Sequence, residues 1–234
     1  MTVSDKSIAP DFLVLVPARK GSKRLPNKNR FSIGNRSLLW RTLDAIRTLG
    51  LSEQTVISTD DEVVAAEAIR LGFSVPTLRP SHLAQDDTST FDVLKHVLAD
   101  VEKRQNWLPK YVLLLQLTSP FRDPKIISRA IDLIQKNNEF SAIVSGKVNR
   151  SRNEKTIGFA ADHVLTYTAD DISEFVEADG NFYVVRISEL IKHGTFLPKG
   201  TKVIVSDQNQ SIDIDTLQDF ALAQDVWRNT YQRY

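Results

Sequence analysis

Positive charge is concentrated in one short segment near the N-terminus, residues 19–30. Six of these twelve residues are Lys or Arg and none is acidic, so the segment can neutralise a polyphosphate. Gly21 is expected to let the backbone turn and approach a ligand closely, and neighbouring amides can cradle phosphate oxygens. The segment matches neither the Walker pattern nor the dinucleotide fingerprint. A solvated basic loop is the competing interpretation, and the position directly after an apolar run favours phosphate binding.

Two aspartates, Asp213 and Asp215, form a second candidate site. In an extended segment, residues two apart project to the same face. Two hard carboxylate ligands on one face suit Mg²⁺ that bridges to phosphate. Either aspartate can instead cap the helix expected to follow. The two roles are compatible, because one residue can cap while the other binds metal.

The elements that must position these residues follow an alternating pattern. Over the first 145 residues, short apolar runs alternate with amphipathic stretches, which predicts a parallel α/β sheet covered on both faces. Strands are expected at residues 12–16, 55–58, 73–78, 111–117, 140–145 and 202–205. Helix starts are expected at Ser37, Asp60 or Asp61, Ser89 or Thr90, and Asp123, with a closing helix over 215–227. Because ligands bind outside the carboxyl ends of such strands, the basic segment is well placed.

The alternation is lost between about residues 148 and 200, which we interpret as an insertion or arm on a single domain spanning 1–234. The chain has no cysteine, which excludes disulfides and thiolate chemistry. A net charge of +1 gives no reason to expect a nucleic-acid partner. No run approaches the roughly 18 apolar residues of a membrane span. We therefore expect a cytoplasmic protein without a membrane partner.

The run ARKGSKRLPNKN resembles the signature of the CMP-sugar synthetases, the cytidylyltransferases that activate sialic acid and related nonulosonic acids. Four further segments match in the same order, at residues 58–60, 78–86, 115–122 and 211–216. The resemblance implies a Rossmann-like three-layer α/β/α nucleotidyltransferase with a mainly parallel sheet and a small dimerisation insertion. It also implies a Mg²⁺-dependent reaction between CTP and a nine-carbon α-keto sugar acid, and a homodimer.

The resemblance also implies roles for individual residues. Catalytic roles fall on Arg19, Lys28 and Asp215. Nucleotide binding falls on Ala18, Arg19, Gly21, Ser22, Lys23, Lys28, Asn29, Arg79 and Thr90. Sugar binding falls on Gln116, Lys155, Asp179 and Tyr183, and metal binding on Asp213 and Asp215.

Several of these roles have structural alternatives. Arg79 can be a surface residue, Gln116 can satisfy backbone amides, and the segment from Asp179 to Tyr183 can be a plain turn before a strand. Around Lys155 the sequence diverges from the family.

The sequence also departs from the family pattern. Arg24 stands where the family usually has glycine, a change also found among enzymes for pseudaminic- or legionaminic-type acids. The family's proline–arginine–glutamine segment, which supplies an arginine to the sugar carboxylate, is missing. Arg150, Arg152 and Arg186 are the candidates to replace it.

Two other functions compete with CMP-sugar synthesis. One is a cytidylyltransferase for another acceptor, such as a deoxyoctulosonic acid. The other is a non-catalytic nucleotide-binding module on the same scaffold. Simple binding does not need a metal pair, so the combination of basic loop and aspartate pair argues against the module.

Overall fold

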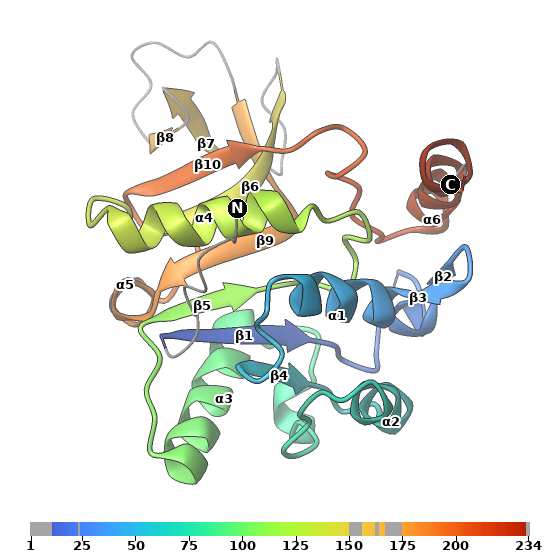
Figure 1. Ribbon diagram of the computed structural model, residues 1–234, viewed down its shortest axis with the longest axis horizontal. Coiled ribbons are helices and arrows are strands. Elements are labelled where there is room, and N and C mark those ends of the chain that lie inside the picture. The colour runs from blue at the N-terminus through green and yellow to red at the C-terminus, as the bar shows by residue number, and fades with distance from the viewer. Residues whose placement is uncertain (1–10, 23, 150–155, 162–163, 167–174, 233–234) are drawn as a thin grey trace, which may run out of the picture.

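The computed structural model describes residues 11–22, 24–149, 156–161, 164–166 and 175–232. Within these residues an eight-stranded sheet forms the centre of the molecule (Figure 1). Its strands are, in spatial order, β4 (Thr55–Ser58), β1 (Phe12–Pro17), β5 (Tyr111–Leu114), β9 (Phe175–Arg186), β6 (Ala142–Asn149), β10 (Thr201–Val205), β8 (Val164–Thr166) and β7 (Thr156–Ala161). A separate hairpin joins β2 (Ser32–Ile33) to β3 (Arg36–Ser37).

The predicted mainly parallel sheet is confirmed. Strand β1 pairs in parallel with both β4 and β5, and β6 pairs in parallel with β10. The long strand β9 lies antiparallel between β5 and β6. Since β5 and β6 both oppose β9, the five remaining central strands all run in one direction, and their carboxyl ends lie on one side of the molecule.

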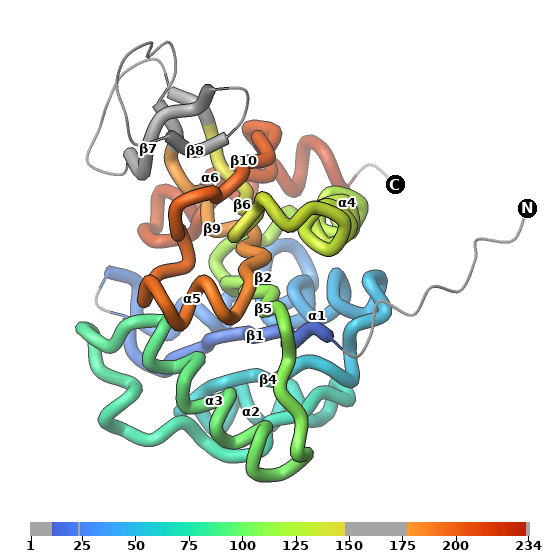
Figure 2. The backbone as a smooth tube through the Cα atoms, turned by 90° about the vertical axis from the view of Figure 1, so that its left-hand side faces the viewer, coloured from blue at the N-terminus to red at the C-terminus, as the bar shows by residue number. Residues whose placement is uncertain are grey.

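Helices cover both faces of the sheet, as predicted. Buried side chains of α1 (Leu38–Thr48), α2 (Glu62–Arg70), α4 (Pro124–Lys136) and α6 (Leu217–Val226) share one apolar cluster with the sheet. The opposite cluster contains α3 (Thr90–Gln105) and α5 (Ile187–His193). The side view shows α1 and α4 on one side of β1 and β5, and α3 and α5 on the other (Figure 2). None of the helices in the described ranges has both the length and the apolar character needed to cross a bilayer.

Four of the predicted helix starts are confirmed by their caps. The side chains of Ser37, Asp61, Ser89 and Asp123 each accept a hydrogen bond from a backbone amide in the first turn, at 2.8 to 3.0 Å. Such caps satisfy amides that have no partner inside the helix. They also fix where the polypeptide turns after β1, β4 and β5, which is where the candidate ligand-binding segments lie.

The expected arm over residues 148–200 needs correction. Its second half contains β9, a central strand of the sheet, followed by α5 on the sheet face. Three buried polar residues, Glu177, Asp179 and Asn181, interrupt the apolar pattern of this strand. Tertiary contacts satisfy one polar atom of each: Asp179 Oδ1 accepts a hydrogen bond from Ser145 Oγ at 2.5 Å, Asn181 Nδ2 donates to the Gln210 carbonyl at 3.1 Å, and Glu177 Oε1 contacts Lys147 Nζ at 3.2 Å. The apolar pattern of the sequence alone therefore does not predict this strand.

Candidate functional site

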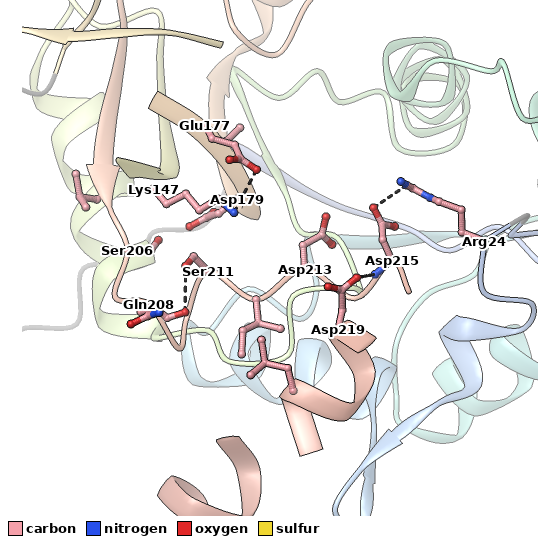
Figure 3. Close-up of a pocket in the computed structure, with 14 residues that line it drawn as sticks. Arg24, Lys147, Glu177, Asp179, Ser206, Gln208, Ser211, Asp213, Asp215 and Asp219 are labelled. Carbon is pink, nitrogen blue, oxygen red and sulfur yellow. Dashed lines mark hydrogen bonds and ion pairs between the residues drawn. The ribbon is translucent and has the colours of Figure 1, made fainter. Parts of the chain in front are cut away.

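Two hollows meet at the carboxyl ends of the parallel strands. The first, here called the basic hollow, measures about 330 Å³ and is lined by residues that include Arg19, Lys28, Asn29, Arg79, Thr90 and Gln116. The second, the acidic hollow, measures about 770 Å³ and is lined by residues that include Lys147, Glu177, Asp179, Ser206, Ser211 and Asp219 (Figure 3). Three residues line both hollows and form a seam between them: Arg24, Asp213 and Asp215.

The basic loop is fixed at both ends by groups at the end of β4. Arg30 makes two hydrogen bonds with the buried carboxylate of Asp61, at 2.8 and 3.0 Å. The amide of Lys20 donates to Asp60 Oδ1 at 2.7 Å. Asn29 Nδ2 donates to the Arg19 carbonyl at 2.8 Å, so Asn29 also ties the two sides of the loop together. The loop is thus a preformed structure rather than a solvated tail.

For three residues predicted to bind the nucleotide, the structure shows only their contacts within the protein. The Ala18 amide donates to the Ser58 carbonyl, and the Ala18 carbonyl accepts from Thr59 Oγ1, so both backbone groups of this buried residue are occupied. Ser22 Oγ accepts from the Leu25 amide at 3.4 Å. Gly21 has no positive φ, and a Cβ there would meet nothing within 4 Å. Neither the backbone conformation nor the packing within the protein therefore requires glycine at this position, and the close approach of Gly21 to a ligand stays a prediction. Asn27, with φ of 58°, has the left-handed conformation in this loop. Lys23 lies outside the described residues.

The seam joins segments from opposite ends of the chain. Lys28 Nζ contacts Asp215 Oδ1 at 2.8 Å. An Arg24 guanidinium nitrogen contacts Asp215 Oδ2 at 2.6 Å (Figure 3). Asp213 and Asp215 both line the two hollows, which fits the expectation that an Asp-x-Asp pair shares one face. Each half of the predicted two-part site therefore contacts the other directly.

Neither seam aspartate caps the closing helix. Thr216 does so: its Oγ1 accepts from the Asp219 amide at 3.2 Å, and Asp219 Oδ2 accepts from the Thr216 amide at 2.8 Å. This reciprocal arrangement is a capping box, and its sequence signal, an acidic residue three positions after threonine, was overlooked. The capping interpretation of Asp213 and Asp215 is therefore wrong.

The donor set of the seam fits a magnesium ion. Mg²⁺ is commonly held by one or two protein carboxylates, with phosphate oxygens and waters completing its shell. Asp213 and Asp215 supply two such carboxylates beside the basic hollow. Within the described part of the chain no group of three or more His, Cys, Asp or Glu side chains forms a closed metal cage. An ion at the seam would thus depend on a phosphate ligand for the rest of its shell.

The far end of the basic hollow contains a buried arginine. Arg79 is only 7% exposed, so the surface interpretation is wrong. Its guanidinium donates to Ser58 Oγ at 3.0 Å and to the Ser58 carbonyl at 2.5 Å. Burial lowers the Arg79 pKa to about 10, which still leaves it protonated at neutral pH. Thr88 and Thr90 line the same hollow and offer hydroxyl groups beside this fixed cation.

Gln116 follows the end of β5 by two residues, as predicted, but it lines the basic hollow and not the acidic one, so its expected contact with the sugar stays a prediction. A Cβ on Gly180 would lie 2.8 Å from Gln116 Oε1, and Gly180 has a φ of 76°, so only glycine fits this close approach. Arg122 stabilises the junction by donating to the carbonyls of Gln116 and Asn181. Burial lowers the Arg122 pKa to about 9, and the nearby carboxylates of Asp179 and Asp213 oppose the shift.

The predicted sugar-side residues separate in the structure. Asp179 lines the acidic hollow. Tyr183 lines neither hollow: its ring packs against Phe196 with centroids 6.2 Å apart, and burial raises its pKa. Lys155 lies outside the described residues, as do Arg150 and Arg152.

Outside the seam, the cation that lines the acidic hollow is not one of the arginines predicted to replace the family's missing one. Arg186 is not available there, because its guanidinium donates to the carbonyls of Ile134 and Phe140 at 2.6 and 2.9 Å. Lys147, on β6, lines the acidic hollow and contacts the buried Glu177 Oε1 at 3.2 Å (Figure 3). Sequence reasoning missed Lys147, because its place beside Glu177 depends on the antiparallel pairing of β6 with β9.

Comparisons with known proteins place these features in a family. A family model described as cytidylyltransferase matches residues 13–183. The chain is 30% identical to a CMP-N,N'-diacetyllegionaminic acid synthase of Legionella pneumophila over 220 residues, which cover 91% of this chain and 94% of the relative. It is also 30% identical to an N-acylneuraminate cytidylyltransferase of Escherichia coli, covering 91% of this chain and 51% of that longer relative.

The fold has solved counterparts as well. A CMP:2-keto-3-deoxy-manno-octonic acid synthetase in complex with CTP superposes with a TM-score of 0.66 at 16% identity, covering 93% of this chain and 98% of the other. At this identity the likeness concerns the fold alone. The family match and the relatives confirm the resemblance to CMP-sugar synthetases stated above. The chain belongs to the cytidylyltransferase family.

Proposed function

We propose that this protein transfers the cytidylyl group of CTP to the anomeric hydroxyl of a nonulosonic sugar acid. The observation that carries the proposal is the seam, where Asp213 and Asp215 line both the basic and the acidic hollow. A reaction that joins an anionic nucleotide to a polyhydroxyl acid needs two adjacent compartments with the reacting phosphorus between them. The names of the relatives, which include a legionaminic acid and an N-acylneuraminate enzyme, support the same substrate class.

In this reaction the sugar hydroxyl oxygen forms a bond to the α-phosphorus, and the bond from that phosphorus to the bridging oxygen breaks. Pyrophosphate leaves with the bonding electrons, and the hydroxyl proton is lost to solvent or to a nearby base. The main task of the protein is to position both groups and to stabilise the departing charge. Mg²⁺ held by Asp213 and Asp215 would supply charge neutralisation at the phosphates.

The cations of the basic hollow take the triphosphate in this proposal. Lys28 acts as a point charge at the seam, and Arg19, which contacts Asp86 at 2.5 Å, offers its guanidinium to the outer phosphates. Arg24 and Lys28 already contact Asp215, so a phosphate that enters the hollow meets donors that are in place. Arg79, Thr88 and Thr90 form the opposite end, which we assign to the nucleoside.

The acidic hollow takes the sugar. Hydroxyl and amide substituents of such an acid are hydrogen-bond donors, and the carboxylates of Glu177, Asp179 and Asp219 are acceptors that suit them. We assign the sugar carboxylate to Lys147, because Lys147 is the cation in this hollow that does not also belong to the seam. Lys147 would thus replace the family's carboxylate-binding arginine, which this sequence lacks.

A turnover assay tests the proposal. The protein is incubated with Mg²⁺, CTP and, separately, legionaminic, pseudaminic, neuraminic and deoxyoctulosonic acids, and pyrophosphate release is measured. Release with the nine-carbon acids is the expected result, and omission of Mg²⁺ should abolish it. Release with the eight-carbon acid alone points to the other acceptor class. CTP binding without release from any acid contradicts catalysis and identifies a nucleotide-binding module.

The homodimer implied by the family resemblance remains a separate proposal, as does the cytoplasmic location. Light scattering after size-exclusion chromatography tests the first, with a mass of twice 26.4 kDa as the expected result. A mass equal to one chain at micromolar concentration contradicts it.

A further inference from the structure

A third hollow lies away from the seam, between the β2–β3 hairpin and the C-terminal helical region. It measures about 720 Å³ and is lined by Gly34, Asn35, Arg36, Trp40, Arg41, Gln224, Trp227, Arg228, Tyr231 and Gln232. We call it the C-terminal hollow. Figure 1 shows α6 beside this hairpin at the same end of the molecule as the carboxyl ends of the strands.

The lining of the C-terminal hollow is cationic and contains no Asp or Glu among the described residues. Arg36 lies over the Trp40 ring at 4.3 Å, and Arg41 lies over the Trp227 ring at 4.0 Å. Within the described residues neither guanidinium has an ion pair with a carboxylate, whereas Arg228 contacts Asp225 at 3.1 Å. The lining therefore carries positive charge that Asp225 offsets at Arg228 and that Asp44 offsets in part at Arg41.

Arg41 is the most informative of these residues. One of its guanidinium nitrogens donates to the Ile33 carbonyl at 2.5 Å, but the buried Nε has no hydrogen-bond partner. Burial is the main cause that lowers the Arg41 pKa; Arg36 adds to the shift, while Tyr231 and Asp44 oppose it. A buried donor without a partner costs stability, and an anion in this hollow would compensate the charge of the guanidinium.

The walls of the C-terminal hollow are already fixed. Gln224 bridges to the hairpin with two hydrogen bonds, from its Nε2 to the Ser32 carbonyl at 2.9 Å and from the Gly34 amide to its Oε1 at 3.2 Å. The Trp227 indole lies so close to Gly34 that a Cβ there would be 2.1 Å from Nε1. A ligand that enters meets an ordered pair of arginines, which reduces the entropic cost of binding.

We propose that the C-terminal hollow is a second anion site, distinct from the seam, that takes a phosphate-bearing anion. Guanidinium groups match phosphate oxygens with two parallel hydrogen bonds, and up to three of them suit a multiply charged anion better than a single carboxylate. The same chemistry is present in inorganic phosphate, in pyrophosphate and in the phosphate of a mononucleotide. The rings of Trp40 and Trp227 are each covered on one face by a guanidinium, so the anion rather than a stacked base provides the recognition.

Calorimetric titration of the full chain tests this site. Pyrophosphate, inorganic phosphate and CMP are titrated separately without Mg²⁺, and pyrophosphate is expected to show two binding events, one in the basic hollow and one here. The double variant Arg36→Gln/Arg228→Gln changes exposed side chains only, and should weaken one event at least tenfold. The matched control Arg129→Gln changes an exposed arginine of α4 and should retain both. The probe that binds most tightly to the event lost in the double variant identifies the source of the phosphate.

Two results overturn the proposal: a single binding event in the unchanged protein for all three probes, or two unchanged events in the double variant. Fluorescence of Trp40 and Trp227 gives an independent measure, because both rings contact the arginines that would bind the anion. The result of this titration does not depend on whether the proposed function is correct. A protein without turnover that still loses one anion event in the double variant contradicts the enzyme and supports this site.

Discussion

The basic and the acidic hollow have opposite charge and share one seam. Arg19, Lys28 and Arg79 line only the first, while Glu177, Asp179 and Asp219 line only the second. The basic hollow is built by turns that follow β1, β4 and β5, whereas the acidic hollow is built by β6, β9 and the segment after β10. The contrast fits the proposal that the basic hollow takes the triphosphate and that the acidic hollow accepts hydrogen bonds from the hydroxyl groups of the sugar acid.

Both hollows are lined by side chains that contacts within the protein hold in place. Around the basic hollow, Asn29 and Arg79 donate hydrogen bonds to carbonyl or hydroxyl groups of the loop and of the strand end. Around the acidic hollow, Asp179 accepts a hydrogen bond from Ser145 Oγ, and Lys147 contacts a buried carboxylate. The two hollows therefore differ in charge rather than in how their side chains are held.

The largest expected effect comes from the seam itself. Asp215→Asn removes the proposed metal ligand and the partner of Lys28 and Arg24, so we expect kcat to fall by about 10³-fold or more. Steady-state pyrophosphate release measures it, and far-UV circular dichroism should remain unchanged. The control Asp225→Asn, which changes an exposed aspartate of α6, should keep full activity. Turnover of Asp215→Asn close to that of the control contradicts the shared seam.

The next largest effect isolates the basic hollow. Lys28→Met keeps the length of the side chain but removes its charge, and we expect kcat/KM for CTP to fall about 100-fold. The KM for the sugar acid should stay within about twofold. Lys136→Met, which changes an exposed lysine of α4, serves as the control. Equal losses for both substrates would mean that the two hollows are not separate compartments.

A smaller and complementary effect isolates the acidic hollow. Lys147→Met removes the proposed partner of the sugar carboxylate, so we expect the KM for the acid to rise about tenfold with the KM for CTP unchanged. Initial rates at saturating concentration of the other substrate separate the two constants. Lys192→Met on α5 is the control. An unchanged KM for the acid excludes Lys147 from carboxylate binding.

The smallest effect concerns how the basic loop is held. Burial alone raises the Asp61 pKa, but hydrogen bonds from Arg30 and the Val63 amide outweigh it, so the pKa lies below its ordinary value. The resulting stability is fully present above the unfolded pKa of about 4 and is lost as the pH falls through the folded pKa.

Asp61→Asn tests this contribution, because asparagine caps a helix as well as aspartate does but cannot form the ion pair. We expect the variant to unfold a few degrees below the unchanged protein at pH 7, with the difference shrinking below pH 4 (about the unfolded pKa). Thermal unfolding followed by circular dichroism measures both. A difference that is constant with pH attributes the loss to the cap instead.

Sequence reasoning located the parts of the fold that depend on neighbours in the chain. Ser37, Asp61, Ser89 and Asp123 cap helices through contacts within three residues, so their roles are legible locally. The basic loop was found because its charge is continuous in sequence. Thr216 and its capping partner Asp219 are also only three residues apart, so the sequence carries enough information to predict this cap.

What sequence reasoning missed depends on distant segments. Strand β9 carries Glu177, Asp179 and Asn181 inward, and only its pairing with β6 supplies partners such as Ser145 and Lys147. Tyr183 was assigned to the sugar from a motif, but the direction in which its ring points is set by packing on Phe196. In both cases the deciding contact joins residues that are far apart in the chain.

The contact between Lys28 and Asp215 also orders events during synthesis. These residues are separated by 187 positions, which a ribosome adding about 5–20 residues per second needs roughly 10–40 s to cover. Throughout that interval the emerging chain carries a basic loop whose carboxylate partner does not yet exist. The seam therefore forms only after the segment around residue 215 has been synthesised, and a chain interrupted before residue 213 would lack it.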